Sequence, residues 1–137
     1  MTAIVSWNIQ CGRGCDGVTD LARIARLARA MGDSDVFCFQ EVARNDPAIA
    51  DGVDQAAQLG ALFPGFQVLF GPGLDRPPRG FGNLLLSRLP VLQVFLHLLP
   101  QPAEGGIKHM QRQAIEAVLE ARGGPLRLMT THLEYYS

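Results

Sequence analysis

Three chemically active side chains each stand at the end of an apolar run in this sequence. Asn8 ends the first run, Glu41 follows Val36–Phe39, and His132 follows Leu126–Thr131. Buried strands that end in an amide, a carboxylate and an imidazole would deliver these groups to one rim. Such a set suits metal-assisted attack on phosphorus, in which a cation neutralises the charge that develops on the phosphoryl oxygens.

Each of these residues has a chemical and a structural interpretation. Glu41 is the predicted metal ligand, because Mg²⁺, or Mn²⁺ in its place, prefers hard oxygen donors and retains several waters. Otherwise it is a carboxylate that is solvated or paired with an arginine. Asn8 is predicted to act in catalysis and at the metal, since its oxygen can accept from a metal-bound water and its NH₂ can donate to phosphate. Otherwise it is a turn residue. His132 is predicted to be catalytic, contacting a phosphate oxygen or the nucleophilic water, although a lone histidine at a strand end is more often structural.

Three further residues are expected to face substrate phosphate. Arg112 precedes a strand and can contact phosphate through its planar guanidinium. Arg13 lies in a glycine-rich loop, and Gln10 stands near the same rim. That loop is not a Walker motif, because the Lys-Ser/Thr pair is missing. Other polar residues are interpreted as structural, solvated or packing residues: His97, His109, Asn83 and Ser87.

The hydrophobic pattern predicts the elements that position these residues. A strand–helix–strand unit opens the chain, with Thr19 as helix N-cap, Asp20 in the first turn and Gly32 at the end. A second helix is predicted to be capped by Asp51 and stopped by Pro64. The predicted strands are Ala3–Ile9, Asp35–Val42, Phe66–Phe70, Leu84–Ser87, Val91–Leu98 and Leu126–Leu133, with loops at Gly71–Gly80 and Gln101–Met110. The segment Arg112–Ala121 could be a helix on propensity alone, but its alternating apolar residues also fit a strand of a hairpin.

Bulk composition limits the class of protein. A chain of 137 residues, 47% of them hydrophobic, can bury a core and is expected to form one domain. The net charge of −1 provides no basic field, which argues against a bulk degrader of DNA. Three cysteines cannot all pair, which favours the cytoplasm, and Cys11 and Cys15 lack the second pair of a zinc site. No apolar run approaches the roughly 20 residues of a membrane helix, so no membrane span is expected.

The order of five strings adds a family resemblance. The strings are SWNIQ (6–10), DVFCFQEV (35–42), GNLLLSRLPV (82–91), RQAIEAVLE (112–120) and LMTTHLEYYS (128–137). In this order they resemble the endonuclease/exonuclease/phosphatase superfamily of metal-dependent phosphoesterases. Members of that superfamily are about twice as long and carry later GDFN-like and SDH-like strings. Residues 1–137 are therefore expected to be the N-terminal half of such a domain.

The resemblance implies a fold, a cofactor and a reaction. The fold is an α/β, four-layer α/β/β/α sandwich, of which this chain should supply one mixed sheet with two helices on its outer face. The cofactor is Mg²⁺, held by Glu41, with Asn8 and His132 at the phosphate and the water. The reaction is hydrolysis of a phosphodiester or phosphomonoester, including nucleic acid among the candidate substrates. The general base would come from the other half, so these residues alone should hydrolyse little.

A second interpretation belongs to a different class of protein. The chain could be a non-catalytic binding module that keeps the half-fold without the chemistry. In either case, a half-sandwich leaves apolar residues of its sheet uncovered, and exposing each large aliphatic side chain costs roughly 1.5–3 kcal/mol. Such a face is expected to be covered by another copy in a homodimer or by the remainder of a longer chain.

Overall fold

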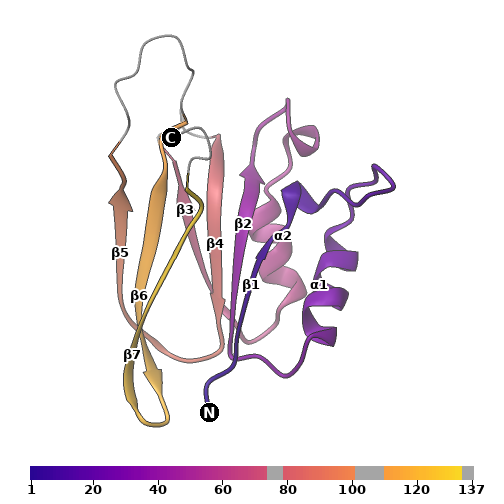
Figure 1. The fold of residues 1–137 in the computed structure, drawn as a ribbon. Coiled ribbons are helices and arrows are strands. Elements are labelled where there is room, and N and C mark those ends of the chain that lie inside the picture. The colour runs from indigo at the N-terminus through magenta and orange to yellow at the C-terminus, as the bar shows by residue number, and fades with distance from the viewer. Residues whose placement is uncertain (74–78, 101–109, 134–137) are drawn as a thin grey trace.

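The computed structural model describes residues 1–73, 79–100 and 110–133, and within them it contains two helices and two β-sheets (Figure 1). A four-stranded mixed sheet has the order β1-β2-β4-β3, and a three-stranded antiparallel sheet has the order β5-β6-β7. The elements are β1 (Ile4–Asn8), α1 (Leu21–Ala30), β2 (Val36–Arg44), α2 (Gln55–Leu62), β3 (Gln67–Pro72), β4 (Gly80–Ser87), β5 (Val91–Leu98), β6 (Gln113–Ala121) and β7 (Gly124–Thr131).

The predicted strands and helices are present, but the expectation of one mixed sheet is wrong, because the described strands form a mixed sheet and a separate antiparallel sheet. The division occurs between β4 and β5. Ser87 Oγ donates to the carbonyl of Leu89 and accepts from its N–H, which turns the chain before Pro90. The strand that follows then pairs with β6 instead of β4. The predicted loops fall mostly on residues 74–78 and 101–109, which lie outside the described residues.

Both helices begin one or more residues later than the sequence predicts. The N-cap of α1 is Asp20, whose side chain accepts from the N–H of Arg23, so Thr19 is not the cap. The N-cap of α2 is Asp54, which accepts from the N–H of Ala57. Each aspartate stands three residues before the amide that it caps, as helix N-termini require. No helix in the described part of the chain is long and apolar enough to cross a bilayer.

Alternate residues of the central strands face opposite layers. Phe37 and Phe39 of β2 pack with Leu84 and Leu86 of β4 beneath the two helices. Between these positions, Cys38 and Leu85 face the other way and pack against the second sheet. Because both faces of β4 are covered, its apolar run is continuous instead of alternating. The cluster shared by the two sheets consists of Val36, Cys38, Leu85, Ile115, Ala117 and Leu119.

Most of the exposed apolar side chains within the strands lie on the second sheet. The sequence predicts them on the inner face of a single sheet, but β6 packs against that face of the four-stranded sheet. The side chains of Leu92, Leu96 and Leu98 on β5 are 55–57% exposed, and Met129 on β7 is 56% exposed. Leu96 and Leu98 align with Ile115 and Gln113, whereas Met129 aligns with Glu116 and therefore lies on the opposite face of the sheet. Leu96 and Leu98 form the exposed apolar strip on β5.

A β-bulge interrupts β2 at Gln40 and Glu41. The pairing of β2 with β4 shifts register between Phe39 and Val42, and Glu41 adopts a φ of 57°. A left-handed conformation costs an L-residue roughly 1–2 kcal/mol. Bulges bend a strand and re-aim its side chains, and they recur next to active sites. The sequence thus places strain at the residue that carries the predicted metal-binding carboxylate.

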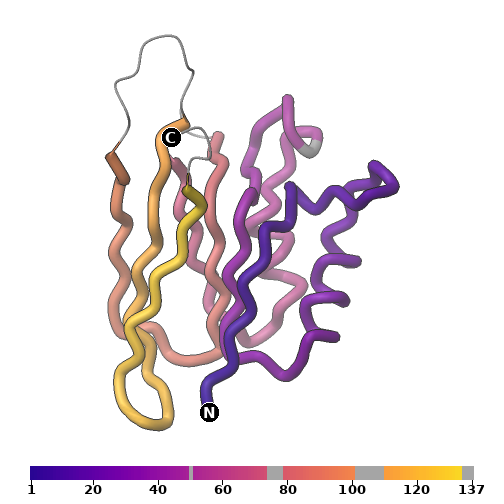
Figure 2. Tube along the Cα trace, viewed as in Figure 1, coloured from indigo at the N-terminus to yellow at the C-terminus, as the bar shows by residue number. Residues whose placement is uncertain are grey.

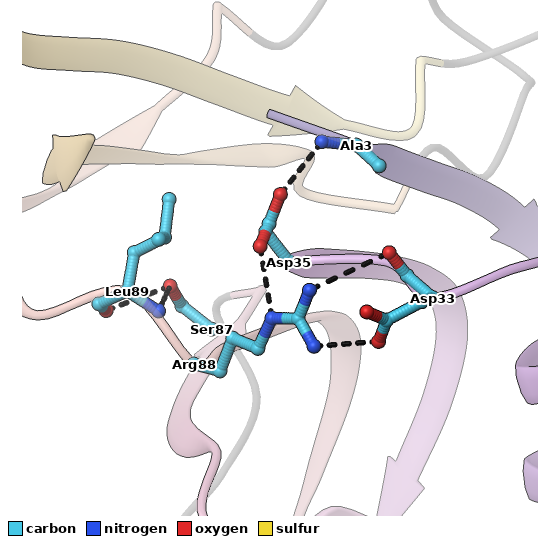
Figure 3. Close-up of polar contacts among 6 residues, drawn as sticks. All are labelled: Ala3, Asp33, Asp35, Ser87, Arg88 and Leu89. Carbon is cyan, nitrogen blue, oxygen red and sulfur yellow. Dashed lines mark hydrogen bonds and ion pairs between the residues drawn. The ribbon is translucent and has the colours of Figure 1, made fainter. Parts of the chain in front are cut away.

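The opposite end of the four-stranded sheet is held by a salt-bridge network (Figure 3). Arg88, just after β4, donates through Nε to Asp35 at 2.8 Å and through a terminal nitrogen to Asp33 at 2.6 Å. The second oxygen of Asp35 accepts from the N–H of Ala3 at 2.8 Å, just before β1. One carboxylate therefore joins the ends of three segments. The Ala3 N–H and then Arg88 hold the pKa of Asp35 below its ordinary value.

The first prediction follows from that lowered pKa. A carboxylate with a depressed folded-state pKa stabilises the fold above the unfolded-state value of about 3.9, and this stabilisation is lost as the pH falls through the folded-state pKa. We expect Asp35→Asn to lower the melting temperature at neutral pH, by an amount that shrinks as the pH drops below about 3.9. Thermal unfolding followed by circular dichroism at several pH values measures this. Asp51→Asn, on an exposed turn, controls for the loss of one charge. A difference in melting temperature between wild type and Asp35→Asn that is the same at every pH would contradict the lowered pKa of Asp35.

The second prediction tests the strain at Glu41. Replacing it with glycine or alanine removes the same carboxylate, but only glycine adopts a positive φ without steric cost. Glu41→Gly should therefore have a free energy of unfolding about 1 kcal/mol higher than Glu41→Ala. Glu120, an exposed residue inside β6, is the matched control. There the order should reverse, with the alanine variant more stable by about 0.5–1 kcal/mol. Urea denaturation of the four variants decides, and the same order at both positions would show that Glu41 is unstrained.

Candidate functional site

The ends of several strands bring four predicted site residues together. The C-terminal ends of β1 and β7 lie at the same end of the molecule, which the indigo and yellow segments of Figure 2 trace. Asn8 Nδ2 donates to Glu41 Oε1 at 2.8 Å, and His132 Nδ1 lies 3.9 Å from the same oxygen. A guanidinium nitrogen of Arg112 lies 3.5 Å from His132 Nδ1. The predicted proximity of Asn8, Glu41 and His132 is confirmed.

The hydrogen bonds of Asn8 define how its amide is oriented. Its NH₂ faces the Glu41 carboxylate, and its oxygen accepts from the backbone N–H of Gln10 at 3.0 Å. As oriented, Asn8 positions the carboxylate and shapes the turn after β1. Coordination of a cation by the Asn8 oxygen would require that oxygen to leave the Gln10 N–H. The structure therefore shows the turn contact of Asn8 together with a hydrogen bond to Glu41.

His132 and Arg112 form the hydrogen-bond-donor side of the site. An arginine guanidinium can only donate, so the contact with Arg112 makes His132 Nδ1 the acceptor and leaves a ring proton on Nε2. The side chain of His132 is 30% exposed and that of Glu41 is 27% exposed, so solvent-borne ligands can reach both. An imidazole Nε2–H and a guanidinium can both donate to phosphate oxygens.

Arg13 and Gln10 lie in a neighbouring groove. They line it together with Asn8, Trp7 and the first turns of α1, and the groove has a volume of about 580 Å³. Neither side chain is hydrogen-bonded to Glu41 or His132. The structure thus separates these two predicted phosphate contacts from the Arg112 side, and Asn8 both lines the groove and contacts Glu41.

Gln55 is a positioning residue that sequence reasoning missed. It is fully buried at the start of α2, where its oxygen accepts from the N–H of Ala43 at 3.0 Å and its NH₂ donates to the carbonyl of Cys11 at 2.7 Å. It therefore clamps the segment after the bulge to the turn after Asn8.

Burial, and then the charge of Glu41, raise the pKa of Cys11 to about 11, so this thiol stays protonated at neutral pH.

A buried polar layer lies between the two sheets beneath the site. Gln40 Nε2 donates to Ser6 Oγ on β1 at 3.3 Å and to Thr130 Oγ1 on β7 at 3.2 Å. Asn83 Nδ2 on β4 donates to the carbonyl of Gln113 on β6 at 3.1 Å. These contacts fix the two sheets to each other near the reactive ends of the strands. Sequence reasoning treats Asn83 as packing and does not single out Gln40 or Gln113, because their partners depend on the register of both sheets.

The donor set fits a hydrated hard cation better than a metal held by protein alone. In the described part of the chain, no group of three or more His, Cys, Asp or Glu side chains lies close enough to hold an ion. Glu41 offers a single carboxylate, and its Oε2 has no hydrogen bond to a described residue. Mg²⁺ keeps several waters and needs only one or two carboxylates, so this site fits Mg²⁺ and does not fit a structural zinc.

Comparison with solved structures shows the same fold in larger proteins. An endonuclease/exonuclease/phosphatase from Beutenbergia cavernae is 30% identical with a TM-score of 0.81 over 96% of this chain and 38% of its own. The human Nocturnin catalytic domain with bound sulfate anion is 20% identical with a TM-score of 0.64, over 97% and 47%. ANGEL2, a 2′,3′-cyclic phosphatase in complex with adenosine-2′,3′-vanadate, is 18% identical with a TM-score of 0.64, over 98% and 42%.

The chain spans between 38% and 55% of the length of the three solved structures that match it first. A search among curated proteins gives no match. The sequence profile of the endonuclease/exonuclease/phosphatase family matches residues 5–126, most of the chain and all strands from β1 to the start of β7. The resemblance inferred from the five strings is confirmed, and the chain belongs to the endonuclease/exonuclease/phosphatase family.

Proposed function

We propose that this chain carries the metal-binding and phosphate-binding half of a magnesium-dependent phosphoesterase. The observation that supports it most is the strained bulge that directs Glu41 toward Asn8, His132 and Arg112. A strained carboxylate at the junction of strand ends is costly for a purely structural residue. The proposed complete fold is the four-layer α/β/β/α sandwich, in which residues 1–137 supply the N-terminal half.

Each described residue has a role that its contacts support. Glu41 would hold the cation through its free oxygen, while Asn8 fixes the orientation of the carboxylate. The bound cation supplies charge neutralisation and substrate alignment. Arg112 and the Nε2–H of His132 would donate to the non-bridging oxygens of the substrate phosphate. The Asn8 oxygen accepts from the Gln10 N–H, so it could accept from a cation-bound water only if the Asn8 amide reorients.

The substrate class is a phosphodiester or a phosphomonoester. Nucleotide and nucleic-acid substrates are included, because the groove lined by Trp7, Arg13 and Gln10 adjoins the site at Asn8. A flat apolar wall beside a guanidinium suits a base or sugar next to the reacting phosphate. The human Nocturnin catalytic domain holds a bound sulfate anion and ANGEL2 is in complex with adenosine-2′,3′-vanadate, which supports an oxyanion ligand for this chain.

Cellular setting and assembly remain part of the proposal. The described cysteines Cys11, Cys15 and Cys38 are all free thiols, which supports a reducing compartment such as the cytoplasm. The exposed apolar strip on β5 supports contact with further protein, either another copy or additional strands and helices of the same fold. The rival proposal of a non-catalytic binding module shares this strip and differs in expecting no cation at Glu41.

The third prediction separates the enzyme from the binding module. Glu41→Gln keeps the shape of the side chain but loses its charge, so Mn²⁺ binding, used as a probe for the Mg²⁺ site, should be lost. Titration of Mn²⁺ followed by electron paramagnetic resonance measures the binding, and Glu120→Gln, at an exposed position of β6, is the matched control. In a protein that carries the complete fold, the same substitution should reduce phosphoester hydrolysis by orders of magnitude. Equal Mn²⁺ affinity for wild type and Glu41→Gln would favour the binding module.

A further inference from the structure

Two buried amide oxygens beside Glu41 have no hydrogen-bond partner among the described residues. They are Asn83 Oδ1 on β4 and Gln113 Oε1 on β6. Asn83 is 2% exposed and Gln113 is 3% exposed. Buried carbonyl oxygens are nearly always paired, so each such exception indicates a missing donor. Both residues line one small cavity, and Glu41, Arg112 and His132 line the same cavity.

The orientation of the two amides is fixed by the backbone. Asn83 Nδ2 donates to the carbonyl of Gln113, and Gln113 Nε2 donates to the carbonyl of Gly71. Rotating either amide would place its oxygen against a carbonyl oxygen, which repels it. The free atoms are therefore acceptors in both cases.

Close backbone packing holds Gln113 in this place. A Cβ atom added to Gly71 would lie 2.6 Å from Gln113 Oε1, and one added to Gly82 would lie 3.0 Å from its Nε2. Any larger residue at Gly71 would displace the Gln113 side chain. Two glycines on adjacent strands thus leave room for a buried amide whose oxygen remains unsatisfied.

The chemistry of the cavity selects what can occupy it. About 10 Å³ of it can hold the centre of a water molecule, roughly the room that one buried water needs. Two acceptor oxygens attract a hydrogen-bond donor and repel a phosphate oxygen. Arg112 and His132, which donate, line the same cavity. The cavity therefore offers acceptors from Asn83 and Gln113 together with donors from Arg112 and His132.

We propose that Asn83 and Gln113 position the hydration shell of the cation at Glu41, by accepting hydrogen bonds from a water bound to that cation. This inference rests on the proposed function, because it assumes that Glu41 holds a hydrated divalent cation. A cation-bound water is a stronger donor than a free one, and it carries no competing negative charge. Asn83 and Gln113 are then positioning residues, which act on the metal site by orienting its bound water.

The test measures Mn²⁺ affinity in variants that remove one acceptor each. Asn83→Leu and Gln113→Met keep the approximate side-chain volume and lose the oxygen. Outer-shell substitutions typically weaken metal binding about 10–100-fold, and we expect each variant to fall in this range by electron paramagnetic resonance titration. Thr130→Val is the matched control, because it breaks a hydrogen bond in the same buried layer without lining the cavity.

The pattern of results distinguishes the inference from the proposal beneath it. Circular dichroism checks that each variant is folded, and Gln113→Met carries the test if Asn83→Leu does not fold. Wild-type affinity in both cavity variants, together with loss of binding in Glu41→Gln, would overturn the inference and leave the proposed function standing. An equal loss in Thr130→Val would also overturn it, since general destabilisation would explain the effect. Absence of Mn²⁺ binding in wild type would overturn both.

Discussion

The bulge in β2 is the constraint on which the site depends. A regular strand would place Gln40 and Glu41 on opposite faces, in step with their neighbours on β4. The register shift between Phe39 and Val42 instead gives Glu41 a φ of 57° and a hydrogen bond to Asn8 on the adjacent strand. Gln55 secures the segment after the bulge to the turn after β1. Contacts from β1, from α2 and from the turn after β1 thus offset the free-energy cost of the positive φ at Glu41.

The layer between the sheets changes character along the strands. Far from the site it is apolar, with Cys38 and Leu85 against Ile115 and Ala117. Near the site it becomes polar, as Gln40, Asn83, Gln113 and Thr130 link strands of both sheets. Apolar contact supplies most of the stability, whereas directed hydrogen bonds fix how one sheet sits on the other. The change occurs where strand ends must be aligned to within the tolerance of a metal site.

Much of this site could be predicted from the sequence, because its residues end apolar runs. Asn8, Glu41 and His132 follow such runs, and strands that run in matching directions must bring their ends together. The number of sheets could not be predicted in this way, since Leu84–Leu86 is apolar on both faces whichever layer covers it. Gln55, Asn83 and Gln113 gave no periodic signal either. Their importance comes from register and burial, which only the assembled sheets define.

The most direct test of this account is the position of a divalent cation in a crystal of the chain grown with Mn²⁺. Anomalous scattering locates the ion independently of any assumption about its ligands. The account predicts one ion at the carboxylate of Glu41, at the roughly 2.0–2.6 Å typical of hard cations and oxygen ligands, with a bound water directed toward Asn83 and Gln113. An ion elsewhere in the molecule, or a β2 without the bulge at Glu41, would contradict it.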